Sequence, residues 1–561
     1  MNRIHQKAGM YTDMDSLHAD VLVIGGGAAA LAAACAAADD GARVLLMDSG
    51  RPARSGSSAT AGGGTAAAFG HTCLGITGNA DTPDIHFEDT LREGHGINNP
   101  RLVRCLVSEI IPIVRRLTAG GVPYTLTDEG LYYQNRGVGQ SFPRNCTPRG
   151  NSAVLCEWLL KTASFRGVAS FACMRAVSLL QDETGVTGAV ALQTDTGRML
   201  HITAGSVVLA AGSATALMPY ASAAFPTWGD SFRLAWEAGA ELANMEFLEF
   251  TFSPVVAGRS FPCGGSTQLV SRGARFINGR GDAFLENNPA LGPHPTRAAL
   301  VPAFYNEIKE GRGPVRLECA SILPEHWEAW EAIGHPLIAL LTTLYGREYR
   351  QKTLEFSPAM HCDLGGIVID EWGRTSIPRL FAAGEATTGI HGASRLGGNA
   401  IAECLVFGTR AGMAAASAAQ SGKETHSATN AVMDTLLGEE AAPVSEHIAQ
   451  LRQTAWETLG VVRNEEDLKR GLALFDEKAA LAQKARAHTA QGIDTLLNLR
   501  GLALTAQLSA RAALERTESR GCHLRADMPD KEDGWRVNLV FARDSGMRPR
   551  RKAVESGENT A

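Results

Sequence analysis

The sequence lacks the cysteine patterns that hold metals or redox clusters. Its 11 cysteines, among 561 residues, are scattered singly from Cys35 to Cys522. They form no Cys-x-x-Cys pair, no haem attachment motif and no ferredoxin spacing. We therefore expect the chain to carry no metal, haem or iron–sulfur cluster, and to belong to a reducing cytoplasm.

The sequence also has no excess of positive charge and no strongly apolar run. The 53 Lys and Arg against 59 Asp and Glu leave a net charge of −6, so nothing favours nucleic acid or an anionic membrane surface as a partner. The first 18 residues lack the apolar core, twin arginines and cleavage pattern of a secretory signal. Residues 21–38 are long enough to span a membrane, but their Gly and Ala supply little hydrophobic drive, and we expect no membrane span.

Glycine, by contrast, is abundant, and the chain is long. The 60 glycines are about one residue in nine, above the average usage of about 7%. The 561 residues exceed what one hydrophobic core usually serves, so we expect at least two domains with room for a large cofactor.

A strand–helix–strand unit opens the recognisable part of the sequence. Residues 20–41 predict a short buried strand (VLVI), a glycine turn and an Ala-rich helix, and a second strand at 43–47 ends at Asp48. Further strand-like and helical runs make the fold a mixed α/β one: 205–211, 366–369 and 102–117.

Composition also marks where this pattern changes. Between 261 and 314, Gly, Pro, Arg and Asn interrupt the alternation, which is typical of an inserted, lid-like region. From about 441 to 516, long helical periodicity indicates a separate helical module. After Asp544 the tail is polar, and we expect it to be flexible.

The turn at Gly25 fits the dinucleotide-binding pattern G-x-G-x-x-G/A. In this pattern the first glycine forms the turn, Gly27 lets the backbone approach a pyrophosphate, and Ala30 allows close helix packing. The amino end of the helix would face the phosphates, and Asp48, 23 residues after Gly25, would accept hydrogen bonds from ribose hydroxyls. This carboxylate argues against NADP but does not separate NAD from FAD, and a packing helix beside an incidental loop is the alternative. The candidate cofactor residues are Gly25, Gly26, Gly27, Ala28, Ala29, Ala30 and Asp48.

The most specific pattern in the chain lies at residues 384–412, which read GEATTGIHGASRLGGNAIAECLVFGTRAG. This segment resembles the C-terminal FAD signature of the flavoprotein family that contains succinate dehydrogenase, fumarate reductase and L-aspartate oxidase. Other segments similar to this family extend over roughly residues 19–543: DIHFEDTLREG from Asp84, TWGD ending at Asp230, MEFLEF from Met245, HCDLGGIVIDEWGRTSIPRLFAAGE from His361, and RTESRGCHLRADMP from Arg516.

The resemblance implies a Rossmann-like α/β FAD-binding domain that is interrupted by a capping domain and followed by a C-terminal helical domain. The compositional changes agree with this organisation. We therefore predict the following division: FAD-binding domain at 19–245 and 351–420, capping domain at 246–350, helical domain at 421–544, and flexible tail at 545–561.

The resemblance also implies positions for the rest of FAD. Asp230 and Glu385 would contact FAD hydroxyls, although Asp230 could instead cap a helix and Glu385 could be a surface carboxylate. Ala400 and Ile401 would offer backbone groups to the isoalloxazine.

The segment 56–70, which reads GSSATAGGGTAAAFG, bears on how FAD is held. Relatives with covalent FAD carry a histidine where this sequence has Ser57, before a glycine turn that here includes Gly63 and Gly64. A serine cannot form that bond, so we expect non-covalent FAD. Because covalent attachment generally makes a flavin a better oxidant, its absence favours reduction or a direct oxidase reaction over succinate dehydrogenation.

Two residues match the carboxylate-binding groups of the family: His361 in PAMHCDLGG and Arg395 in GASRLGGN. The planar donors of arginine can grip a carboxylate bidentately, and a histidine adds a donor near the flavin. The alternatives are a hydrogen-bonded core histidine and a surface arginine. His391, inside the FAD signature, we interpret as structural.

The capping segment departs from the family pattern. Thr251 stands where relatives have a substrate-binding histidine, or Ser253 does if the gap is placed differently, and the Thr-Glu pair of relatives is missing. The arginine that delivers the proton has no secure counterpart, since Val270 falls on it in an ungapped alignment. Arg272 and Arg275 lie nearby and are the candidates, with a solvated surface charge as the alternative for each.

These features predict an FAD-dependent oxidoreductase that exchanges hydride between flavin N5 and a carbon of a carboxylated small molecule. Only one end of a dicarboxylate site is assured, and leaving charge unpaired in a dry pocket costs several kcal/mol, so we expect substrates other than succinate, fumarate and aspartate. The acidic residue that aspartate oxidases use for the amino group is also absent from residues 135–146.

Two other functions stay open: a sulfur-redox flavoprotein similar to adenylylsulfate reductase, and an FAD-holding subunit without catalysis. Because the chain has no metal or haem motif, its electrons would be exchanged with a diffusible reductant, oxygen, a quinone, or a separate iron–sulfur or flavin subunit.

Overall fold

The structure is a computed structural model. It describes residues 15–62, 64–70, 80–223, 227–256, 258–261, 269–270, 273–286, 288, 291, 296–332, 336–420, 436–438 and 443–555.

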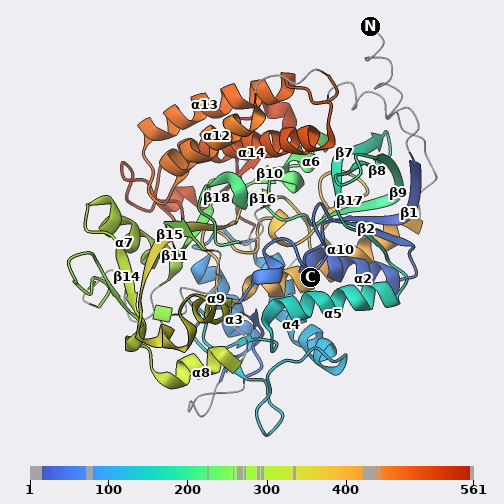
Figure 1. Ribbon diagram of the computed structural model, residues 1–561. Coiled ribbons are helices and arrows are strands. Elements are labelled where there is room, and N and C mark those ends of the chain that lie inside the picture. Colours follow the sequence, from blue (N-terminus) through green and yellow to red (C-terminus); the bar gives the residue numbers. More distant parts are fainter. Residues whose placement is uncertain are drawn as a thin grey trace.

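A seven-stranded sheet lies at the centre of the first domain (Figure 1). It is built on β1 (Asp15–Ile24), whose VLVI residues are all buried, as expected for a strand covered on both faces. The strand order is β6–β2–β1–β9–β8–β7, and β17 also pairs with β9. The strands β2, β6, β9 and β17 join β1 in a parallel arrangement, whereas β8 and β7 add antiparallel. Their bounds are β2 (Val44–Met47), β6 (Ala169–Phe171), β7 (Met174–Asp182), β8 (Gly185–Gln193), β9 (Met199–Leu209) and β17 (Leu380–Ala382).

Two helices from distant parts of the chain, α2 (Ala28–Asp39) and α10 (Asn399–Gln420), pack closely against each other. A Cβ added at Gly412 would lie 2.2 Å from the carbonyl oxygen of Ala33, and one at Gly408 would lie 2.5 Å from that of Ala29. The run of small residues at 21–38 therefore serves close packing of two backbones. Among the described residues, no helix is long and apolar enough to cross a membrane.

Other elements surround this pair of helices. The helical run expected at 102–117 lies within α4 (Pro100–Ala119), and the strand expected at 366–369 is shorter, as β16 (Gly366–Ile367). The remaining elements of the first domain are α3 (Pro83–Glu93), α5 (Asn151–Phe165), α6 (Asp230–Ala238), β3 (Thr65–Ala66), β4 (Gln134–Asn135), β5 (Asn145–Cys146) and β10 (Leu242–Ala243).

The capping region contains a five-stranded antiparallel sheet in the order β12–β11–β15–β14–β13. Its core is aromatic: the ring of Phe252 stacks on Phe304 at 4.2 Å and meets the edges of Phe276 and Phe356. The sheet continues past residue 350, because β15 reaches residue 363 before the chain returns to the first domain. The bounds are β11 (Leu248–Val256), β12 (Arg259–Ser260), β13 (Arg275–Ile277), α7 (Arg297–Lys309), β14 (Val315–Glu318), α8 (Pro324–Ala332), α9 (Pro336–Tyr345) and β15 (Thr353–Asp363).

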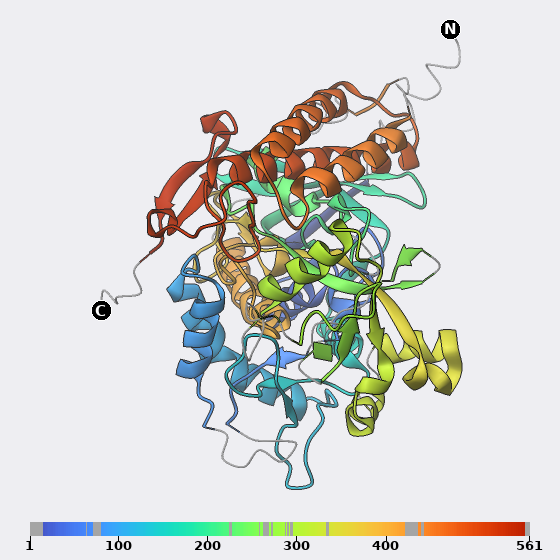
Figure 2. The ribbon, with the colours of Figure 1, turned by 90° about the vertical axis from the view of Figure 1, so that its left-hand side faces the viewer.

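Three long helices form the helical domain and lie together along one side of the molecule in both ribbon views (Figures 1 and 2). They are α12 (Val444–Leu459), α13 (Glu465–Lys484) and α14 (Ala490–Glu515). The chain then returns to the first domain, where β18 (Val537–Phe541) pairs with β10.

Residues 545–555, the described part of the tail that we expected to be flexible, contain a strand. Strand β19 (Arg550–Ala553) pairs with β18 in an antiparallel register. An unpaired strand edge leaves backbone hydrogen-bonding groups open, and β19 satisfies those of β18. The polar composition did not indicate this strand, because all four of its residues are exposed and it is held by backbone pairing.

Candidate functional site

A large cavity opens at the turn between β1 and α2, where the sequence predicted phosphate binding. Gly25 has φ +124°, and a Cβ there would lie 2.2 Å from the carbonyl oxygen of Ala210, so only glycine fits this turn. Gly27 is the N-cap of α2 and supplies no capping side chain, although the amide of Ala28 donates to Ser58 Oγ at 3.2 Å. A glycine turn that leads into a helix N-terminus is a site for a pyrophosphate.

Asp48 borders the same cavity at the end of β2. Its Oδ1 accepts hydrogen bonds from the amide of Gly50 and from Ser55 Oγ, both at 2.7 Å. Burial raises the pKa of this carboxyl, while these two hydrogen bonds act in the opposite direction. The two donors fix the carboxyl group at the edge of the cavity, where it suits the hydroxyls of a ribose.

Asp230 also borders the cavity, but a partner that the sequence did not reveal holds it. Arg175 donates two hydrogen bonds to the Asp230 carboxylate, Nε to Oδ2 at 3.0 Å and Nη2 to Oδ1 at 2.8 Å. Burial opposes ionisation of Asp230, but Arg175 and then Arg233 bring its pKa below the usual value. Arg175 also donates to Asp494 and Asn498 of α14, both of which line the cavity, so the helical domain helps to close it.

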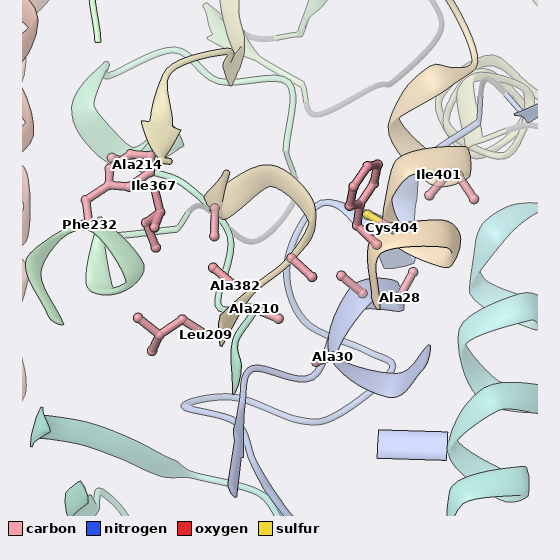
Figure 3. Packing of buried hydrophobic residues seen from close by; sticks show 14 of the residues in the cluster. Ala28, Ala30, Leu209, Ala210, Ala214, Phe232, Ile367, Ala382, Ile401 and Cys404 are labelled. Atoms are coloured by element: carbon pink, nitrogen blue, oxygen red, sulfur yellow. The ribbon is translucent and has the colours of Figure 1, made fainter. Parts of the chain in front are cut away.

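The first cavity adjoins a second one. Both are lined by Ser57, Ser58, Glu385 and Cys404. Figure 3 shows Cys404 close to the first residue of α2, on the opening turns of α10. Two joined cavities, one of them at a glycine turn, suit an elongated dinucleotide such as FAD, with phosphates at the glycine turn and a ring system in the second cavity.

Glu385 lies where the two cavities meet. Ser213 Oγ donates to its Oε1 at 2.6 Å, and burial raises the pKa of this carboxyl to about 7. The group is therefore partly protonated near neutral pH and can either donate to or accept from a cofactor hydroxyl. Ala400 and Ile401 line the second cavity from the first turn of α10, as does Gly64 from the loop that follows Ser57. Gly63 lies outside the described residues.

His361 and Arg395 come together in the second cavity, although they are separated in sequence. His361 lies on β15, and its Nδ1 is 2.8 Å from Ser222 Oγ. Burial, followed by Arg297 and Arg395, holds the pKa of His361 well below its usual value, so the ring is neutral at pH 7. Arg395 is 7% exposed and also lines the cavity.

Arg297 is a second cationic group at this cavity, beside Arg395, and sequence reasoning missed it. It begins α7, after the N-cap Thr296, and it is 7% exposed. Its guanidinium forms an ion pair with Glu249. The only sequence signal is the Thr-Arg pair at the start of a helix within the irregular segment, since nothing in the spacing relates residue 297 to residue 361.

Of the cap residues that we proposed as catalytic, the two that the structure describes do not line the second cavity. Arg275 lies on β13 and makes surface ion pairs with Glu286 and Glu318, each at 3.2 Å, with 46% of its side chain exposed. It does not line the described cavity, and neither does Thr251, which is buried in β11 opposite Ala359. Arg272 lies outside the described residues.

Glu249 on β11 joins the two buried arginines. Besides its ion pair with Arg297, it accepts a hydrogen bond from the backbone amide of Arg395 at 3.0 Å and lies 3.4 Å from Arg395 Nη2. The Cys362 thiol donates to it at 3.4 Å. Burial alone would favour the neutral acid, but Arg297 and Arg395 lower the pKa of Glu249 to about 2, so it is an anion at neutral pH.

His391 and Glu403 form a separate buried pair in the wall of the second cavity. His391 Nε2 lies 2.7 Å from Glu403 Oε2, and Thr387 Oγ1 donates to Glu403 Oε1 at 3.1 Å. Within the described part of the chain, no group of three or more His, Cys, Asp or Glu is arranged to hold a metal ion.

Comparison with known proteins shows which protein families this chain matches. A family model described as "FAD binding domain" matches residues 20–401, and one described as "Fumarate reductase flavoprotein C-term" matches residues 448–555. The chain is 32% identical to one of the subunits of the fumarate reductase (CoM/CoB) of Methanothermobacter marburgensis, over 93% of this chain and 97% of that protein. It is 31% identical to the L-aspartate oxidase of Caulobacter vibrioides, over 89% of this chain and 91% of that protein.

Solved structures show the same fold. Mycobacterium smegmatis Sdh1 superposes with a TM-score of 0.83 at 26% identity, over 97% of this chain and 96% of that one. The adenylylsulfate reductase of Archaeoglobus fulgidus superposes with a TM-score of 0.79 at 18% identity, over 98% of this chain and 97% of that one. At the lower identity the likeness concerns the fold alone.

Proposed function

We propose that this chain, which belongs to the FAD-dependent oxidoreductase family of the succinate dehydrogenase, fumarate reductase and L-aspartate oxidase flavoproteins, acts on the carbon chain of a small carboxylic acid. The observation that carries the proposal is the convergence of Arg395, His361 and Arg297 on the second cavity, which adjoins the cavity at the glycine turn and would also hold the flavin ring. Bound FAD supplies the hydride donor or acceptor, at flavin N5.

Arg395 and His361 bind the substrate carboxylate. A guanidinium offers parallel donors that match the two carboxylate oxygens, and the low exposure of Arg395 strengthens that contact. In the tautomer in which Ser222 donates to Nδ1 of His361, the proton of the neutral ring resides on Nε2. That N–H then donates to the substrate without adding a second positive charge.

Arg297 handles the proton at the substrate carbon. Among the cap residues that the structure describes, it is the cationic group that lines the cavity, and it forms an ion pair with Glu249. In the reductive direction, hydride reaches one carbon of an activated double bond and Arg297 delivers a proton to the neighbouring carbon. The guanidinium is then reprotonated from solvent, and the reverse sequence gives dehydrogenation.

We propose that FAD is held non-covalently and that reduction is the favoured direction. Ser57, which lines both cavities, offers no ring nitrogen to the flavin. Electrons would be exchanged with a diffusible reductant, oxygen, a quinone, or an iron–sulfur or other electron-transfer subunit. Several described cysteines are free and buried, which supports a reducing, cytoplasmic location: Cys35, Cys156, Cys319, Cys362, Cys404 and Cys522.

We propose substrates other than succinate, fumarate and aspartate, because the cap departs from the family at Thr251 and lacks the Thr-Glu pair. A sulfur-redox role like that of adenylylsulfate reductase rests on fold similarity alone. A subunit without catalysis would have no need of three buried cationic or imidazole groups that line one cavity.

The test is anaerobic photoreduction of the yellow holoenzyme, followed by a screen of α,β-unsaturated acids for re-oxidation. We expect at least one acid to restore the oxidised flavin spectrum, and Arg395→Ala to abolish the response. The control is Arg275→Ala, which removes a guanidinium from the cap surface and should leave the rate unchanged. An unchanged rate in Arg395→Ala would remove this residue from the site.

A further inference from the structure

Arg297 and Arg395 line the same part of the substrate cavity, but the net positive charge there is smaller than that of two arginines. Glu249 is 1% exposed and lies against both guanidiniums, from the side of β11. It does not line the main cavity, but together with Arg297 it lines a separate, smaller one. Glu249 therefore neutralises charge from behind the cavity wall while leaving the cavity open to substrate.

The ionised groups around Arg297 and Arg395 have a net charge of +1. Arg297 and Arg395 are cations, Glu249 is an anion, and His361 is neutral because burial and the two arginines lower its pKa. One substrate carboxylate therefore completes an electrically neutral cluster.

No other described group in the cavity wall offsets a second negative charge. The remaining titratable groups of the wall are carboxyl groups, one of them paired with a histidine, and two thiols whose pKa burial raises: Asp363, Glu385, Glu403 with His391, Cys362 and Cys404. Behind the wall, Glu93 of α3 accepts a hydrogen bond from Ser394 Oγ at 3.0 Å and adds another acidic group. A dianionic substrate would thus place its second carboxylate in the cavity without a cationic partner among the described residues of the wall.

We infer that Glu249 is a specificity-determining residue that restricts the substrate to an acid with a single carboxylate, such as a 2-enoic monocarboxylic acid. This inference rests on the proposed function and narrows its substrate class. Glu249 acts in two ways: it cancels one buried positive charge, and it occupies donors of Arg297 and Arg395 that a second carboxylate would need. The site thus discriminates against a dicarboxylate by leaving its second carboxylate without a cationic partner.

The experiment compares three probes that share a four-carbon unsaturated skeleton. Crotonate and monomethyl fumarate carry one negative charge, fumarate carries two, and monomethyl fumarate matches fumarate in the position of its second carbonyl group. Each is titrated into the oxidised FAD holoenzyme, and its dissociation constant is read from the change in the flavin absorption spectrum. We expect either monoanion to bind at least tenfold tighter than fumarate.

The variant Glu249→Gln keeps the size of the side chain and removes its charge. We expect it to improve fumarate binding at least tenfold relative to monomethyl fumarate, and so to narrow or invert the preference. Glu318→Gln is the matched control, because it removes a cap carboxylate that pairs with Arg275 at the surface, and its preference should equal that of the wild type.

The outcomes separate this inference from the proposed function. If fumarate binds to the wild type as tightly as monomethyl fumarate, the inference is overturned while the proposed function stands. If no probe and no other carboxylate perturbs the flavin, the proposed function itself fails. If Glu249→Gln does not yield folded yellow protein, the wild-type titrations alone decide, because the net charge of +1 predicts that monomethyl fumarate binds more tightly than fumarate. A folded variant with an unchanged preference would also overturn the inference.

Discussion

Replacing Arg297 by glutamine should separate proton transfer from substrate binding. The residue is buried at the start of α7 and lines the cavity from the cap, whereas Arg395 approaches from the segment before α10. Glutamine keeps a hydrogen-bonding side chain that can reach Glu249, but it cannot carry the proton that a guanidinium delivers. Glu249 also retains Arg395 as its ionic partner, so the fold should survive.

The expected loss of rate follows from the proposed role of Arg297 in proton transfer. Proton transfer by a positioned side chain contributes about 10²–10⁴-fold to a rate, or about 3–5 kcal/mol. We expect kcat of Arg297→Gln to fall by about this factor, while the dissociation constant of a monocarboxylate rises no more than about tenfold, the equivalent of about 1.4 kcal/mol. Arg395→Gln should show the opposite balance, with most of its loss in binding.

The assay is stopped-flow re-oxidation of the photoreduced flavin by the best acid from the screen, together with spectral titration of the oxidised enzyme. Arg275→Gln is the control, since it removes an arginine from the cap surface and not from the cavity. A rate for Arg297→Gln within threefold of the wild type would refute the assignment of the proton to this residue.

Three further outcomes follow from the packing and the buried charges. Arg175→Ala leaves Asp230 as a buried carboxylate without its main partner, so FAD retention should drop and unfolding free energy should fall by about 3–5 kcal/mol, measured by flavin release and thermal unfolding. Gly412→Ala puts a Cβ 2.2 Å from the carbonyl oxygen of Ala33 and should cost about 1–3 kcal/mol, read from a denaturant midpoint; no shift would contradict the close packing of α2 on α10. The folded pKa of Glu249, about 2, lies below its ordinary value of 4.5, so its ionisation stabilises the fold above pH 4.5 and that contribution fades as pH falls toward 2. Stability of the wild type should therefore decline more steeply than that of Glu249→Gln over this range, and parallel pH profiles would argue against the buried anion.

The cofactor half of the site was accessible from sequence because it depends on local geometry. The glycine turn, the strand before it and Asp48 all lie within one βαβ unit, where backbone rules relate residue type to position. Arg175 was missed because it lies on β7, and only the folded sheet brings it to Asp230.

The substrate half was only partly accessible, for a related reason. His361 and Arg395 belong to segments with strong resemblance to the family, and Glu249 lies in MEFLEF, which is also similar to the family, although nothing in that segment indicates its ion pairs. Arg297 lies further along the cap, where the resemblance breaks down. An ion pair between residues 249 and 297 depends on how α7 packs on β11, which no spacing rule predicts. The β19 strand escaped prediction in the same way, because its partner is the edge of β18.

A crystal structure of the yellow holoenzyme with bound crotonate would test the central claim most directly. The account predicts non-covalent FAD across the two joined cavities and the crotonate carboxylate within hydrogen-bonding distance of Arg395 and His361, with Arg297 facing its double bond. A carboxylate bound elsewhere, or side chains of Arg395 and His361 that point away from the flavin, would contradict it.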